Sequence, residues 1–157
     1  MILLRRKEAC RMKIKVPYII DDPIVGRTLS PTVMGLVGSM SIIFPRDYIM
    51  RDGDDLIYHH SSKRRIDSFK INSTSRFVVQ NRTFSFWDKE FKLKQLRPGE
   101  RSGVETTLLL IDFEEKSHVL IPPFHISRWQ KTWNRFLIKL SKNIGLQVQE
   151  FNIHEDG

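Results

Sequence analysis

Residues 125–146 read HISRWQKTWNRFLIKLSKNIGL and carry the clearest secondary-structure signal in this sequence of 157 residues. Ser127 followed by Gln130 fits a capping box, in which Ser127 is the N-cap residue of a helix. Gly145 stands where a glycine commonly ends a helix in the left-handed conformation. The stretch therefore predicts one amphipathic helix over residues 127–144.

The predicted helix has two opposed faces. At 100° per residue, its large apolar side chains fall within an arc of about 100°. They are Trp129, Trp133, Phe136, Leu137, Leu140 and Ile144. The basic side chains fall within an arc of about 80° on the opposite side. They are Arg128, Lys131, Arg135, Lys139 and Lys142.

The apolar face is expected to pack on a core. No Asp or Glu lies between Ser127 and Gly145, although mixed signs would relieve the repulsion between like charges four residues apart. The basic face is therefore either an anion-binding surface or a solvent-exposed face that happens to lack acids.

Ahead of the helix, short β-rich runs alternate with turn signals, as is typical of a barrel or sandwich. The predicted strands are 41–44 with 48–50, then 56–60, 66–71, 76–79, 83–87, 91–96, 106–113 and 118–121. Turns are expected between them, one of them at residues 80–82. The apolar run 107–111 predicts a central strand, and Pro122-Pro123 is expected to end the strands. Residues 146–153 fit one more short strand or a strap.

The first forty residues differ in character from the rest. KIKVPYII, residues 13–20, predicts a strand that Pro17 places at a sheet edge, because proline cannot donate to the ladder. Asp21-Asp22-Pro23 predicts a turn, and residues 26–38 are expected to be irregular. The prediction is a basic N-terminal extension over 1–40, with an edge strand and an irregular segment. A β-barrel-like domain follows over 41–157.

The fold class predicted is α+β, a mainly antiparallel β-barrel or strongly bent sheet capped by one C-terminal amphipathic helix. The order of elements over roughly 41–144 resembles pleckstrin-homology-type barrels of small bacterial proteins. The resemblance rests on strand spacing, on the hairpin ETTLLLIDFEEKSHVLIPPF at 105–124 and on the single following helix. It implies seven short antiparallel strands closed by a helix, and a role in binding or assembly rather than in catalysis.

The charge balance indicates an anionic partner. Lys and Arg number 26 and Asp and Glu 18, which gives a net charge of +8, and such an excess favours nucleic acid, acidic protein or anionic membrane. A second basic cluster, Lys63-Arg64-Arg65, follows His59-His60 on an expected hairpin loop. Because Cys10 is the single cysteine, no intramolecular disulfide or cysteine-based zinc site can form, and a reducing compartment such as the cytoplasm fits best.

Few residues suggest catalysis or a metal site. Glu114-Glu115-Lys116 and Glu90-Phe91-Lys92 have the acid-x-lysine spacing of some metal-dependent nucleases, but the pattern is short and arises by chance. His59 and His60 would point to opposite faces of a strand, whereas His118 and His125 could lie close together. No nucleotide-binding or hydrolase motif occurs. The sequence therefore indicates no catalytic residue, metal ligand, cofactor or small-molecule substrate.

The expected function is that of a non-enzymatic interaction module. It would dock on an acidic protein complex or on nucleic acid through the basic helix face, with Lys63, Arg64 and Arg65 as further contacts. One alternative is a small metal-dependent nuclease. The other is a peripheral membrane-surface protein that uses the basic N-terminus and the uncharged segment 28–45.

Overall fold

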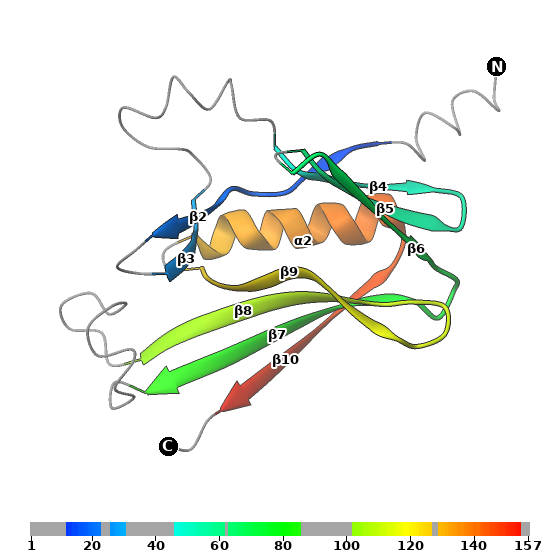
Figure 1. Cartoon of the computed structure of the whole chain (residues 1–157). Helices are drawn as coiled ribbons and strands as arrows, with labels where there is room; N and C mark the ends of the chain where they lie inside the picture. Colours follow the sequence, from blue (N-terminus) through cyan, green and yellow to red (C-terminus); the bar gives the residue numbers. More distant parts are fainter. Residues whose placement is uncertain are drawn as a thin grey trace.

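The computed structural model describes residues 12–22, 26–30, 46–61, 63–85, 102–126 and 129–154. This part of the chain forms two open β-sheets and one helix (Figure 1). Sheet A has the order β1-β4-β5-β6 and is antiparallel throughout. Its strands are β1 (Ile14–Lys15), β4 (Tyr48–Asp52), β5 (Asp55–His60) and β6 (Arg65–Lys70).

Sheet B has the order β10-β7-β8-β9-β3-β2. Its strands are β10 (Gln147–His154), β7 (Arg76–Ser85), β8 (Ser102–Ile111), β9 (Ser117–His125), β3 (Gly26–Leu29) and β2 (Ile19–Asp22). Pairing is antiparallel except between β10 and β7 and between β3 and β9. The α+β class and the mainly antiparallel pairing are thus confirmed. The closed barrel is not observed, since both sheets of the described residues have two free edges.

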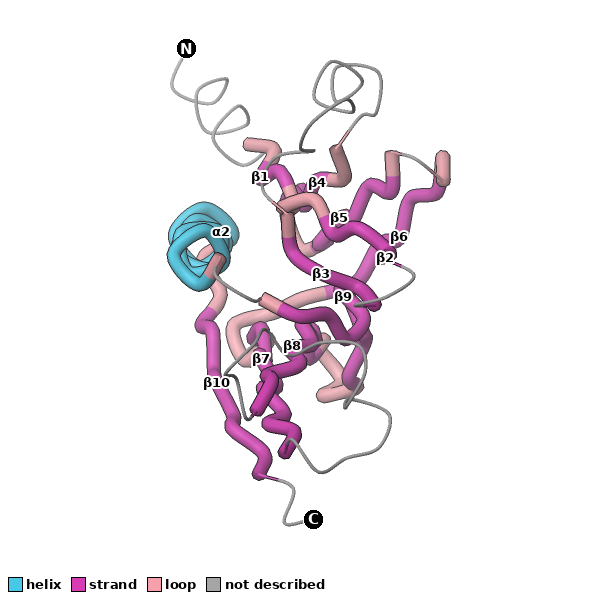
Figure 2. The backbone as a smooth tube through the Cα atoms, turned by 90° about the vertical axis from the view of Figure 1, so that its left-hand side faces the viewer, coloured by secondary structure: helices cyan, strands magenta, loops and turns pink. Residues whose placement is uncertain are grey.

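Helix α2 (Gln130–Ile144) lies on one side of the molecule beside sheet A, with β10 of sheet B below it (Figure 2). Its predicted apolar face is buried, and Trp133 and Leu140 have no exposed surface. They pack in one core with residues of both sheets, among them Ile49 of β4 and Phe77 of β7. Hydrophobic burial therefore holds the helix against the two sheets together.

The helix begins later than the capping box predicts. Trp129 occupies the N-cap and makes no side-chain capping bond, while its backbone N–H donates to the carbonyl of Ile126 at 3.0 Å. Ser127 and Arg128 lie outside the described residues. The predicted end is confirmed, because Gly145 adopts a φ of 79° and its N–H donates to Ser141 O, as a left-handed C-terminal cap does.

The stretch predicted as one strand around Pro17 forms two. Ile14–Lys15 pairs with β4 in sheet A, whereas Ile19–Asp22 pairs with β3 in sheet B. The chain passes from one sheet to the other at Pro17, and both strands are sheet edges as predicted. The prediction of a turn at Asp21-Asp22 is wrong, because these two residues belong to β2. Residues 26–29, expected to be irregular, form β3.

Two further boundaries differ from the prediction. β7 continues through residues 80–82, where a turn was expected, and pairs there with β8 without interruption. β9 continues through Pro122-Pro123, which were expected to end the strands. The ladder to β8 is irregular between Thr106 and Leu108. A strand can accommodate proline at such an irregularity because the missing N–H disrupts no regular pair.

Candidate functional site

The basic helix face consists of Lys131, Arg135, Lys139 and Lys142 in the described part of α2, and all four side chains are exposed. None of them forms an ion pair with another described residue. Arg128, predicted as a fifth member, lies outside the described residues. The four cations thus form a surface of one sign.

An exposed isoleucine lies at the edge of this group of cations. Ile138 is 64% exposed, more than any other large hydrophobic residue described. At 100° per residue it falls within about 40° of Lys131 and Lys142 on the helix surface, and it lies three residues from Arg135. The basic helix face therefore has an exposed apolar side chain at one edge, with Asn134 and Ser141 on the far side of it, a feature that the charge pattern alone did not reveal.

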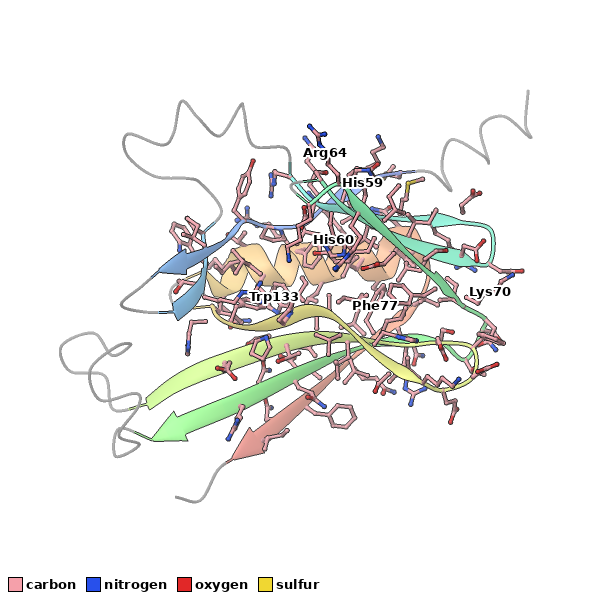
Figure 3. All side chains as sticks on the ribbon, viewed as in Figure 1. His59, His60, Arg64, Lys70, Phe77 and Trp133 are labelled. Carbon is pink, nitrogen blue, oxygen red and sulfur yellow. The ribbon has the colours of Figure 1, made fainter. Side chains whose placement is uncertain are left out.

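The second predicted cluster lies in the turn between β5 and β6. The Ser61 N–H donates to Asp47 Oδ1 at 2.9 Å, and Ser61 Oγ donates to the carbonyl of Arg46 at 2.9 Å. These bonds fix the start of the turn against the residues that precede β4. Arg64 has a φ of 50° and points away from the molecule, whereas His60 points toward the space between the sheets (Figure 3).

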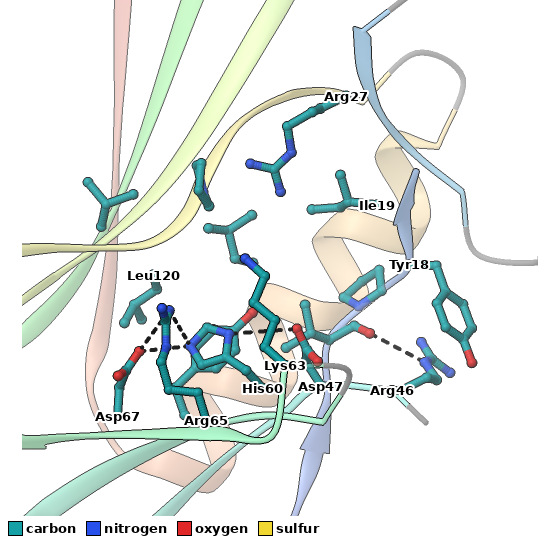
Figure 4. Close-up of a pocket in the computed structure, with 16 residues that line it drawn as sticks. Tyr18, Ile19, Arg27, Arg46, Asp47, His60, Lys63, Arg65, Asp67 and Leu120 are labelled. Atoms are coloured by element: carbon teal, nitrogen blue, oxygen red, sulfur yellow. Dashed lines mark hydrogen bonds and ion pairs between the residues drawn. The ribbon is translucent and has the colours of Figure 1, made fainter. Parts of the chain in front are cut away.

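Lys63 and Arg65 line a cleft between the two sheets, here called the inter-sheet cleft (Figure 4). Its volume is about 500 Å³. Four cations line it: Arg27 of β3, Arg46 ahead of β4, Lys63 in the β5–β6 turn and Arg65 of β6. Apolar residues of β9 and of the segment 16–19 also line it. The structure thus separates Lys63 and Arg65 from Arg64, which is not among the lining residues.

Two carboxylates in the inter-sheet cleft are engaged by their neighbours. Asp67 Oδ2 lies 2.8 Å from His60 Nε2 and 3.3 Å from Arg65 Nη2. Asp47 Oδ2 lies 3.9 Å from His60 Nδ1. With four cations against two carboxylates, the lining carries an excess of two positive charges when His60 is neutral.

Aromatic rings support the basic side chains of the cleft. The Arg46 guanidinium lies 4.9 Å from the centroid of the Tyr18 ring, and Arg46 Nε donates to the carbonyl of Val16 at 3.3 Å. The Tyr58 and His60 rings stack at 4.1 Å. Burial, and next the carboxylate of Asp47, raise the pKa of the Tyr58 phenol above its ordinary value. Tyr58 therefore stays neutral in the physiological pH range.

The acid-x-lysine triplet at residues 114–116 forms an ordinary hairpin turn. Lys116 Nζ pairs with Glu114 Oε2 at 3.0 Å on the exposed surface. Asp112 Oδ1 accepts the backbone N–H groups of Glu114 and Lys116, both at 2.9 Å. The other triplet, Glu90-Phe91-Lys92, lies outside the described residues.

The histidines form no metal site in the described structure. His59 and His60 do point to opposite faces of β5: His59 stacks on Tyr48, and His60 on Tyr58. His118 and His125 stand near opposite ends of β9 and do not meet, since they pair with different ends of β8. Among the residues described, no group of three or more His, Cys, Asp or Glu could hold a metal ion.

Within the described residues, α2 is too short and too polar to cross a membrane. No family model, curated protein or solved structure matches this chain.

Proposed function

We propose that this protein is a non-enzymatic interaction module that docks on an acidic protein surface through the basic helix face. The observation that supports the proposal is an exposed helix face that bears cations and no acid, opposite a face buried in the core. A solvent-exposed helix ordinarily mixes charge signs, because like charges four residues apart destabilise it by a few tenths of a kcal/mol per pair.

Ile138 favours an acidic protein over nucleic acid as the partner. Protein interfaces commonly have a buried apolar anchor at the centre and a polar rim. Ile138 matches that arrangement, because it has the cations on one side and the polar residues Asn134 and Ser141 on the other. Duplex nucleic acid presents mainly phosphates to such a helix face, and phosphates offer no pocket for an aliphatic side chain. The partner expected is therefore a protein with a small apolar depression beside a group of Asp and Glu.

A fold similar to that of pleckstrin-homology-type proteins is part of this proposal. A series of short antiparallel strands followed by one amphipathic helix supports it. This chain differs from such a barrel in two ways. Both sheets have open edges, and strand β10 follows the helix. We also infer a reducing compartment such as the cytoplasm, because Cys10 is the single cysteine of the sequence.

The first test compares Arg135→Glu with Lys70→Glu, a control that makes the same charge change at an exposed residue of β6. The protein is purified with its native partner, with and without nuclease treatment. Arg135→Glu should bind the partner at least tenfold more weakly, equivalent to about 1.4 kcal/mol, while Lys70→Glu stays near wild type. Equal losses of partner affinity in the two variants would show that the basic helix face is not the docking surface.

Three further tests separate the alternatives. Ile138→Ser should also weaken binding, since it removes the apolar anchor without changing the charge. Loss of the complex on nuclease treatment would identify a nucleic acid instead. DNA and RNA should remain uncut with Mg²⁺ or Mn²⁺; cleavage that Glu114→Gln abolishes would establish the nuclease alternative.

A further inference from the structure

The inter-sheet cleft has the size and the lining of a small-molecule site. Its volume of about 500 Å³ lies within the range of about 300–1,000 Å³ that is common for ligand pockets. One part of the lining is apolar and includes Ile19, Leu120 and Ile121. The other part is cationic. A ligand that fills the cleft would therefore have an organic portion and an anionic group.

The cations come from separate walls of the inter-sheet cleft. Arg27 extends into it from β3, and Lys63 from the β5–β6 turn on the opposite side (Figure 4). Arg46 approaches from a third direction and is held in place by Tyr18 and the carbonyl of Val16. Lys63 and Arg46 form no ion pair with any residue in the part of the chain described. Their charges are thus available to a ligand.

The placement of these cations favours a phosphate over a carboxylate. A carboxylate is planar and is best bound by one guanidinium along a single edge. A terminal phosphate carries about two negative charges and three acceptor oxygens, which donors from different directions can share. With His60 neutral, the excess of two positive charges in the lining matches the charge of such a group.

We propose that the inter-sheet cleft binds a small, soluble phosphate ester, with the phosphate between Arg27 and Lys63 and the organic group against Ile19 and Leu120. This site is separate from the basic helix face, because α2 and the β5–β6 turn lie on opposite sides of the molecule (Figure 2). Tyr58 also lines the cleft, and its phenol is a neutral hydrogen-bonding group.

The experiment titrates the full chain with phenyl phosphate, benzoate and phenol at constant ionic strength, followed by calorimetry or NMR. Phenyl phosphate should bind saturably at one site, at least about fivefold more tightly than benzoate, and phenol should not bind measurably. Equal affinities for phenyl phosphate and benzoate would overturn the phosphate preference. Absence of saturable phenyl phosphate binding at millimolar concentrations would overturn the site itself.

Lys63→Gln and Arg64→Gln form a matched pair of variants in one turn. Both remove one positive charge from an exposed residue, but only Lys63 lines the inter-sheet cleft. Lys63→Gln should weaken phenyl phosphate binding at least about fivefold, whereas Arg64→Gln should leave it nearly unchanged. Equal losses of affinity in the two variants would show that phenyl phosphate binding depends only on the net positive charge of the turn and not on a specific contact with Lys63.

Two controls separate this site from other sources of binding. Arg135→Glu should retain phenyl phosphate affinity, because Arg135 does not line the cleft. The phosphate site can therefore be confirmed even if the docking proposal fails. Phosphatidylcholine vesicles that contain phosphatidic acid test a lipid phosphate as the ligand. If the protein binds these vesicles in a Lys63-dependent manner but does not bind phenyl phosphate, the proposal of a soluble ligand is wrong and the ligand is a lipid phosphate.

Discussion

Arg51 joins sheet A to the end of the helix that carries the proposed docking face. Its Nη1 donates to the carbonyl of Ile144 at 2.6 Å, and its Nε donates to the carbonyl of Gly53 at 2.8 Å. Ile144 is the last residue of α2. Its carbonyl has no partner within the helix and belongs to the negative end of the helix dipole. The guanidinium thus caps α2 and binds the β4–β5 turn at the same time.

We expect Arg51→Met to lower the free energy of unfolding by about 2 kcal/mol. A hydrogen bond from a charged donor contributes about 1.5–3 kcal/mol, and a cation at a helix C-terminus about 0.3–1 kcal/mol. The expected loss lies toward the lower part of the combined range, since Arg51 is partly exposed and water replaces some of the lost interaction. Methionine keeps most of the apolar stem, so packing changes little.

Urea denaturation measures this loss, with Arg65→Met as the matched control. Arg65 is also an arginine of sheet A, but its side chain is 57% exposed and pairs with Asp67 on the surface. Its removal should cost less than about 1 kcal/mol. Arg51→Lys should fall between wild type and Arg51→Met, because one ammonium group replaces two separated donors. If Arg51→Met and Arg65→Met have the same midpoint, Arg51 does not cap the helix.

Three other changes test the fold. Trp133→Ala should lower the unfolding free energy by about 3–5 kcal/mol, because a fully buried side chain is lost; a midpoint near wild type would contradict the packing of α2. Gly145→Ala should cost about 1–2 kcal/mol in the same assay, since φ is 79°. A hydrogen bond from His118, then two backbone N–H groups, lower the pKa of Asp112 despite the opposing effect of burial. The stability from Asp112 should thus be present above about pH 4, near the pKa of an unfolded Asp, and be lost gradually as the pH falls from there through the lower folded-state pKa. Asp112→Asn and wild type should therefore converge in acid; a constant gap would refute this.

The helix could be predicted from the sequence because its signal is local. Trp133, Leu140 and Ile144 repeat at the helical period, and Gly145 marks the end at a residue that requires a positive φ. The start of the helix could not be predicted as well. Ser127 and Gln130 match a capping pattern, but the helix starts at Gln130, and the Trp129 N–H donates to the carbonyl of Ile126. A pattern of two residues does not detect that bond.

The boundaries of strands depend on partners that are distant in the sequence. Residues 80–82 are polar and predict a turn, yet β7 continues through them. Asn81 Nδ2 donates to Glu150 Oε1 at 2.8 Å and to Asn152 Oδ1 at 3.1 Å, and Asn81 Oδ1 accepts from Thr106 Oγ1 at 2.8 Å. These bonds satisfy the amide within the sheet. Their donors and acceptors lie in β8 and β10, so no local pattern could have revealed them.

The inter-sheet cleft shows the same limit. Lys63 and Arg65 stand out in the sequence because they belong to a run of basic residues. Arg27 and Arg46 are isolated in the sequence and have no such signal. They join the cleft only because the chain changes sheets at Pro17, which places β3 in sheet B opposite the β5–β6 turn. A site assembled by the packing of two sheets can be recognised only after their order is known.

The two basic surfaces are held by different means, which bears on how each can act. The cations of α2 extend from a helix whose opposite face is fixed in the core, so their spacing is that of the helix itself. This suits a partner surface that contacts several charges at once. Around the inter-sheet cleft, Arg46 is held by Tyr18, and the turn before Lys63 is fixed by the bonds of Ser61 to Asp47 and to the carbonyl of Arg46. Lys63 itself makes no ion pair with a described residue, which leaves its long side chain free to adjust to a ligand of modest size.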